Sequence, residues 1–134
     1  MDEATFKART RAFGLRSMKL CDSLPKSRSA DVVGRQLLRS SLSVGANYRA
    51  ACRAKSRKDM IAKLAIVEEE CDESVNWLEV IAETEMISKR RLTGLIKEGN
   101  EILAMTVASI KTLRARSDAQ SVQSKLQNPK SKIE

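Results

Sequence analysis

Residues 60–81, MIAKLAIVEEECDESVNWLEVI, carry the most regular pattern in the chain. Apolar and small side chains recur there at alternating spacings of four and three: Met60, Leu64, Val67, Cys71, Ser74, Leu78 and Ile81. This spacing aligns them along one side of an α-helix, whereas a half-buried strand would alternate every second residue. The segment predicts a long helix, capped by Ser56 and running to about residue 85, whose apolar side packs on other helices.

A second segment, residues 88–116, repeats the same rhythm after a Ser88 cap. Its periodic positions are Leu92, Ile96, Gly99, Leu103, Thr106, Ile110 and Leu113. Two helices with this spacing are typical of a bundle in which neighbouring helices pack nearly antiparallel. We therefore predict a core centred on Met60, Leu64, Val67, Cys71, Leu78, Ile81, Leu92, Ile96, Leu103 and Ile110.

Two further helices precede this pair. The first covers residues 4–23 and stops before Pro25, because proline disfavours helical geometry in the residue before it. The second begins near Ser29 or Asp31 and runs to about residue 54. Small residues crowd positions 40–46 of the second helix, which allows another backbone to approach closely, and Asn47 lies on its predicted inner face.

The composition supports an all-α fold. The chain of 134 residues has only 5 Gly and 2 Pro, and 3% aromatic residues, too few for a many-turned β protein. We predict an antiparallel up-down four-helix bundle over residues 1–116, assembling into a ring, and a disordered polar tail over residues 117–134. Trp77 lies beside the seam, either in the core or at a subunit contact.

Catalytic and metal sites are disfavoured by the residue types present. Histidine is absent, which removes the commonest general base and metal ligand, and the three cysteines lack zinc-type spacing. The carboxylate cluster at residues 68–73 is interpreted as a solvated or ion-paired face, and the glycines form no phosphate loop. We expect no enzymatic activity, cofactor or metal.

The location expected is the cytoplasm. Three cysteines are an odd number, nothing resembles a secretory signal, and no apolar run reaches the ~20 residues that span a bilayer. Cys21, Cys52 and Cys71 are expected to be small buried hydrophobes, although Cys52 stands beside cations that favour a reactive thiolate.

Charge is segregated along the chain. The net charge of +8 is the sum of +10 over residues 1–58, −8 over residues 59–88 and +6 over residues 89–134. A basic excess is typical of proteins that bind nucleic acid or an anionic membrane. The same segregation is also consistent with an acidic helix lying against basic ones, in the bundle or in a neighbouring subunit.

The strongest candidate surface is residues 49–58, RAACRAKSRK, where five cations occur without one acid: Arg49, Arg53, Lys55, Arg57 and Lys58. Clusters of this kind bind phosphate backbones without sequence readout. The alternative is an ordinary solvated helix end, because cations also favour helix C-termini. Aromatic residues are too few for a base-stacking platform.

Three blocks resemble a known family. Residues 36–49, QLLRSSLSVGANYR, then 56–64, SRKDMIAKL, and then 73–79, ESVNWLE, are similar to the bacterial four-helix-bundle proteins encoded in 23S rRNA intervening sequences. The resemblance covers about residues 13–114. One departure is Ala50, where the family pattern has an acidic residue.

The resemblance implies a closed bundle, often a ring-shaped homopentamer, with no known enzymatic activity. Related bundles are nucleic-acid-binding accessories of reverse transcriptases. The leading hypothesis is therefore an accessory protein that binds nucleic acid, with structured RNA favoured over DNA. The alternative is an oligomeric scaffold for a protein partner such as a reverse transcriptase.

Overall fold

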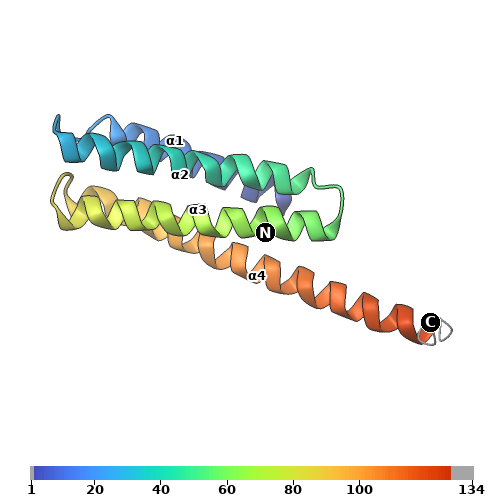
Figure 1. The fold of residues 1–134 in the computed structure, drawn as a ribbon. Coiled ribbons are helices and arrows are strands. Elements are labelled where there is room, and N and C mark those ends of the chain that lie inside the picture. The colour runs from blue at the N-terminus through green and yellow to red at the C-terminus, as the bar shows by residue number, and fades with distance from the viewer. Residues whose placement is uncertain (1, 128–134) are drawn as a thin grey trace.

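The computed structural model describes residues 2–127 and contains four α-helices there. They are α1 (Glu3–Cys21), α2 (Arg28–Cys52), α3 (Arg57–Glu83) and α4 (Lys89–Gln127). Short turns join them, so each helix runs antiparallel to the one before it (Figure 1). The predicted antiparallel four-helix bundle is confirmed.

Side chains at the helix starts fix the boundaries. Asp2 accepts a hydrogen bond from the Thr5 amide at 2.7 Å, Ser27 accepts one from the Ala30 amide at 3.1 Å, and Ser56 caps α3 as predicted. The predicted cap at Ser29 or Asp31 is wrong. Ser27 follows directly on the Pro25 turn and already has the extended geometry of an N-cap.

The core lies along the bundle axis, and most of its predicted centre is confirmed. Seven predicted residues are buried: Leu64, Val67, Cys71, Leu78, Ile81, Leu92 and Ile110. Met60, Ile96 and Leu103 are only half-buried at its edge. On α4 the buried positions are instead Leu95 and Ile102, one residue earlier than predicted. The strict alternation of four and three residues led to Ile96 and Leu103, which form a neighbouring apolar stripe on the same helix.

The small residues of α2 are used inside the chain. Ser40 and Ser41 are buried, and the Ser40 and Ser74 hydroxyls are hydrogen bonded at 2.9 Å between α2 and α3. Asn47 is half-buried and donates to the Ser43 carbonyl at 2.9 Å, so its side chain is satisfied within its own helix. Half-buried Trp77 packs on the core and donates to Glu73 at 3.3 Å.

Helix α4 does not end near residue 116. It continues through Gln127 and projects past the other helices at the end where α2 turns into α3 (Figure 1). The prediction of a disordered tail is thus wrong for residues 117–127, and residues 128–134 lie outside the described part. The segment contains no Gly or Pro before residue 128, so no helix-breaking residue ends α4 where its packing on the other helices stops.

None of the four described helices combines the length and apolarity required to cross a membrane.

Candidate nucleic-acid interface

The five predicted cations gather at one end of the bundle, divided between two settings. Arg49 and Arg53 lie in the last turn and C-cap of α2, and line a groove between α2 and α1. Lys55 lies in the turn that follows, and Arg57 and Lys58 open α3. The structure therefore brings two of the five into a groove and leaves three around the adjacent turn.

The groove adds two cations that the sequence analysis missed. Lys7 and Arg11 of α1 face Arg49 and Arg53 of α2 across a cavity of about 530 Å³. No acidic residue is among those that line it. The sequence held part of the evidence, because two cations four residues apart lie on one side of a helix. It did not show that this side of α1 packs against α2.

Close packing of α1 and α2 forms the floor of the groove. A Cβ added at Gly14 would lie 3.1 Å from the Ser41 carbonyl oxygen, and one added at Gly45 would lie 3.1 Å from the Arg11 Cα. The missing side chains let the two backbones approach, and the exposed Leu15 and Leu42 cover the remainder of the floor. The four cations thus border a partly apolar groove.

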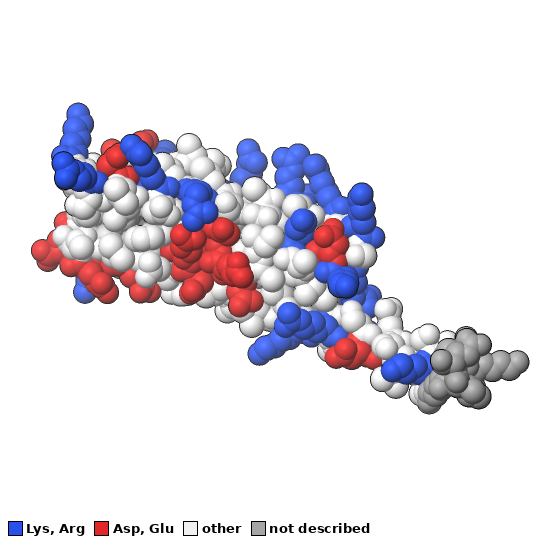
Figure 2. Space-filling view, viewed as in Figure 1, with Lys and Arg blue, Asp and Glu red and all other residues white. Residues whose placement is uncertain are grey.

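The groove cations are free to engage an external anion. Within residues 2–127, Lys7, Arg11, Arg49 and Arg53 form no ion pair with an acidic side chain. In Figure 2 basic side chains project from the α1–α2 side near this end, whereas acidic ones concentrate over the middle of α3. An unpaired cation retains its full attraction for phosphate.

The cations around the turn differ from one another. Arg57 donates to the Gln120 side chain at 2.7 Å, which attaches the projecting part of α4 to the start of α3. Lys55 and Lys58 are exposed. All three therefore border the groove end without lining the groove itself.

The carboxylates of α3 are engaged with α2. Arg39 contacts Glu73 at 3.0 Å and lies 3.9 Å from Glu70. Burial raises the pKa of Glu70, with Arg39 opposing the shift. The acidic cluster therefore packs in part on α2, and no group of metal-binding residue types large enough to hold an ion occurs in residues 2–127.

The cysteines behave as packing residues. Cys71 is buried, Cys21 and Cys52 are half-buried, and all three are free thiols. Burial raises the pKa of Cys71 to about 12 and that of Cys21 to about 11. The pKa of Cys52 is also raised, first by burial and then by a hydrogen bond with Glu3. A raised thiol pKa disfavours the reactive thiolate, so the alternative of a reactive Cys52 is not supported.

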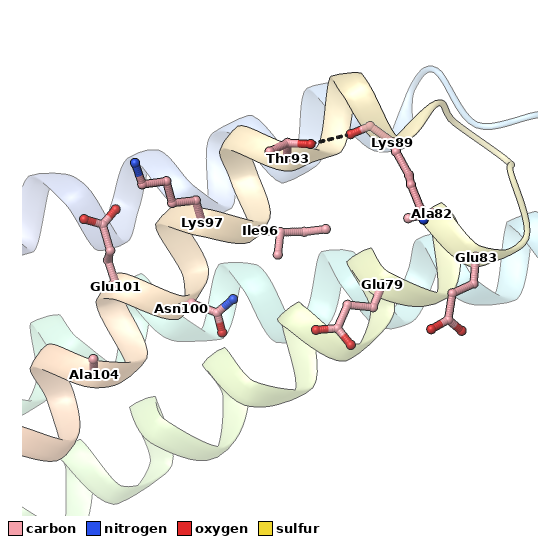
Figure 3. A pocket seen from close by; sticks show the side chains of 10 residues that line it. All are labelled: Glu79, Ala82, Glu83, Lys89, Thr93, Ile96, Lys97, Asn100, Glu101 and Ala104. Atoms are coloured by element: carbon pink, nitrogen blue, oxygen red, sulfur yellow. Dashed lines mark hydrogen bonds between the residues drawn. The ribbon is translucent and has the colours of Figure 1, made fainter.

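A second groove lies between α3 and α4, near their connecting turn, with a volume of about 710 Å³. Figure 3 shows Ile96 between the two helices, with Glu79 and Glu83 on the α3 side and Lys89 and Lys97 on the α4 side. Ala82 and Ala104 complete an apolar floor. Mixed charge around an apolar trough suits a protein segment better than a phosphate chain.

Comparison with known proteins gives a consistent result. The model of the family described as 23S rRNA-intervening sequence protein matches residues 3–108. The chain is also similar to a crystal structure of a protein with unknown function from the S23 ribosomal protein family of Bacteroides thetaiotaomicron, with 34% identity and a TM-score of 0.74. That similarity covers 79% of this chain and 98% of the other. No curated protein matches.

Proposed function

We propose that this chain, which belongs to the 23S rRNA-intervening sequence protein family, is a non-enzymatic protein that binds nucleic-acid phosphates in the cytoplasm. Structured RNA is the favoured ligand. The groove cations Lys7, Arg11, Arg49 and Arg53 are the main contacts, and Lys55, Arg57 and Lys58 extend the surface around the turn.

The observation that carries this proposal is the convergence, on one groove lined by no acid, of four cations from two helices that form no ion pair within residues 2–127. Helix-end capping explains a cation on α2, but not the matching pair that α1 contributes. Lys and Arg in such an array neutralise successive phosphates and read no base edges. We therefore expect affinity with little sequence preference.

Self-association belongs to the same proposal. The small residues at 40–46 pack largely within the chain, and Arg39 pairs there with Glu70 and Glu73. The support for a ring therefore comes from the remaining opposed charges of α2 and α3 and from the resemblance, which alone supplies the number five. Heterologous contacts close into a ring when the rotation between copies is right. Five grooves on one ring would combine weak sites into useful avidity.

The alternative function, an oligomeric scaffold for a protein partner such as a reverse transcriptase, is favoured by the α3–α4 groove. Its apolar floor around Ile96 is open, and its Glu and Lys borders offer ion pairs to a helical segment. This surface is remote from the basic groove, so the two functions are separable by mutation.

The test is a charge reversal on both sides of the basic groove. Arg11→Glu/Arg53→Glu should weaken binding to structured RNA and to duplex DNA roughly tenfold or more at ~50 mM salt, because phosphate contacts dominate there. The loss should be similar for unrelated sequences, and the dependence of log affinity on log salt should become shallower. Fluorescence anisotropy across a salt series gives both quantities.

A matched control separates this groove from a general charge effect. Arg28→Glu/Arg90→Glu makes the same change in net charge at exposed positions near the opposite end of the bundle. We expect that variant to lose much less affinity. Equal losses in both variants, or no binding by the wild type at ~50 mM salt, would contradict the proposal and favour the protein-partner alternative.

A further inference from the structure

The projecting part of α4 carries an apolar stripe that no other residue between positions 2 and 127 covers. Ala115, Ala119, Val122 and Leu126 recur at spacings of four, three and four, and all four are exposed. Val122 is 58% exposed and Leu126 69%, the highest values among large hydrophobic residues in the described part of the chain. Large apolar side chains repeated on one helix face are typical of a helix–helix interface.

The stripe faces away from the bundle. Leu113 and Ser117 are partly buried, and Gln120 accepts the hydrogen bond from Arg57 of α3, so these three define the inward side of the segment. At about 100° per residue, the stripe lies on the opposite side of the helix. The core of this chain therefore gives no reason for Val122 and Leu126 to be apolar.

The segment also lies outside the shared family fold. The family match ends at residue 108, close to where α4 leaves the other helices. Residues 111–127, which we call the arm, are thus an addition to the bundle. An inference about the arm is independent of the nucleic-acid function proposed above.

We propose that the arm binds the arm of a second copy of this chain, antiparallel, through this stripe. A two-fold axis passing between residues 120 and 121 sets Ala119 against Val122 of the second copy and Ala115 against its Leu126. The symmetry repeats both pairs, so that each of the four layers joins one alanine to one large side chain. Alternation of small and large residues fills such a seam without voids.

Charge complementarity selects this arrangement. The residues bordering the stripe include Asp118 and Lys125, and the antiparallel register places Asp118 of each copy opposite Lys125 of the other. In a parallel pairing identical residues would meet, Ala119 on Ala119 and Leu126 on Leu126. Lys111 would then approach Arg116 of the other copy, a repulsive contact.

Four layers make a short interface, because isolated helices of about three turns are marginal in water. We therefore expect weak pairing that becomes effective when several arms act together. If the bundles form rings, arms link one ring to another; if they do not, arms pair single chains. The two outcomes differ only in the unit that is paired.

Disulfide trapping tests the orientation. Protein with Ala119→Cys is mixed with protein carrying Val122→Cys and oxidised gently, and the products are identified by intact mass, with the wild type as control for Cys21, Cys52 and Cys71. The antiparallel register predicts the mixed dimer in excess over either homodimer. A parallel pairing would give homodimers, and trapping equal to the wild type would mean no pairing; either result overturns the proposal.

Solution mass tests the strength. Val122→Glu/Leu126→Glu should weaken the concentration-dependent association roughly tenfold or more, equivalent to about 1.4 kcal/mol. Val32→Glu is the matched control, because Val32 is 54% exposed on α2, and it should leave the mass unchanged. The proposal fails if both variants behave alike or if only a helix from another protein assembles on the stripe.

Charge exchange provides a second check on the same register. Asp118→Lys and Lys125→Asp should each weaken association, because each sets like charges against one another. The double variant Asp118→Lys/Lys125→Asp should restore it. Absence of that rescue would overturn the antiparallel register. RNA binding is measured on the same proteins, so that a failure of arm pairing can be told apart from a failure of the proposed nucleic-acid binding.

Discussion

Arg9 joins α1 to α4, which contact each other less extensively than helices that follow one another in the chain. Its guanidinium makes a two-point contact with Glu98, with the Nε–Oε2 distance at 2.9 Å, and lies 3.9 Å from Glu101. The hydrogen bond from Arg9 holds the pKa of Glu98 below its usual range. Two-point contacts of this kind are the stronger form of an ion pair.

We predict that Arg9→Met lowers the free energy of unfolding by roughly 1 kcal/mol, because the pair is partly buried but still reached by water. A carboxylate with a lowered folded pKa stabilises the fold above its unfolded pKa, and that contribution is lost as pH falls through the folded value. The difference from wild type should therefore shrink below about pH 4. Urea unfolding at pH 7 and pH 3 measures it.

Arg11→Met is the control for this prediction, since Arg11 is exposed and forms no ion pair in residues 2–127. Its effect on stability should be small at both pH values. If Arg9→Met lost the same free energy of unfolding at both pH values, the packing of the Arg9 side chain and not its charge would be the cause.

At this scale the sequence revealed the basic residues but not their grouping. Arg49 and Arg53 were visible as part of a run without acids. Lys7 and Arg11 are distant in the chain, and only the approach of α1 to α2 at Gly14 and Gly45 brings them in. Small residues indicate that two helices can touch, but they do not say which two.

Two glycines of α4 show how helix propensity and packing compete within one element. Gly94 is exposed, and an added Cβ would lie 3.6 Å from the Arg16 guanidinium, an ordinary contact. Gly99 is buried, and an added Cβ would lie 2.7 Å from Val75 and 3.2 Å from the Phe13 ring. Gly99 therefore lets α4 approach both α1 and α3.

We predict opposite results for the same substitution at the two sites. Gly94→Ala should raise the free energy of unfolding by about 0.5–1 kcal/mol, because alanine restricts the unfolded chain and favours helix. Gly99→Ala should lower it by about 1–3 kcal/mol through overpacking. Thermal unfolding followed by circular dichroism compares them. Equal changes would mean that α4 shifts to accept the methyl group.

Element by element, the helices were more predictable than their faces and ends. The period of α3 gave its buried side correctly. The periodic positions from Leu64 to Ile81 are all buried, and only Met60 at the start of the helix is half-buried. On α4 two apolar stripes run in parallel, and Ile96 and Leu103 were chosen where Leu95 and Ile102 are buried. The extension to Gln127 was missed because apolar rhythm reports packing, not helix formation.

The whole molecule is predicted to be a closed oligomer. Light scattering should give a multiple of the 14.9 kDa chain mass, and five times that mass if the resemblance holds. The measurement is best made on Val122→Glu/Leu126→Glu, so that arm pairing does not contribute. A mass of one chain at every salt concentration would contradict the ring and leave a single groove per particle.

The separation of charge described above has a consequence for how a polyanion first meets this protein. With cations on the α1–α2 side and at one end, and carboxylates over α3, a distant phosphate chain exerts a torque as well as a pull (Figure 2). If the proposed binding occurs, this torque turns the groove toward the ligand before any contact forms. Since that field reaches only ~10 Å in 0.1 M salt, rising ionic strength randomises the angle of approach as well as slowing the encounter.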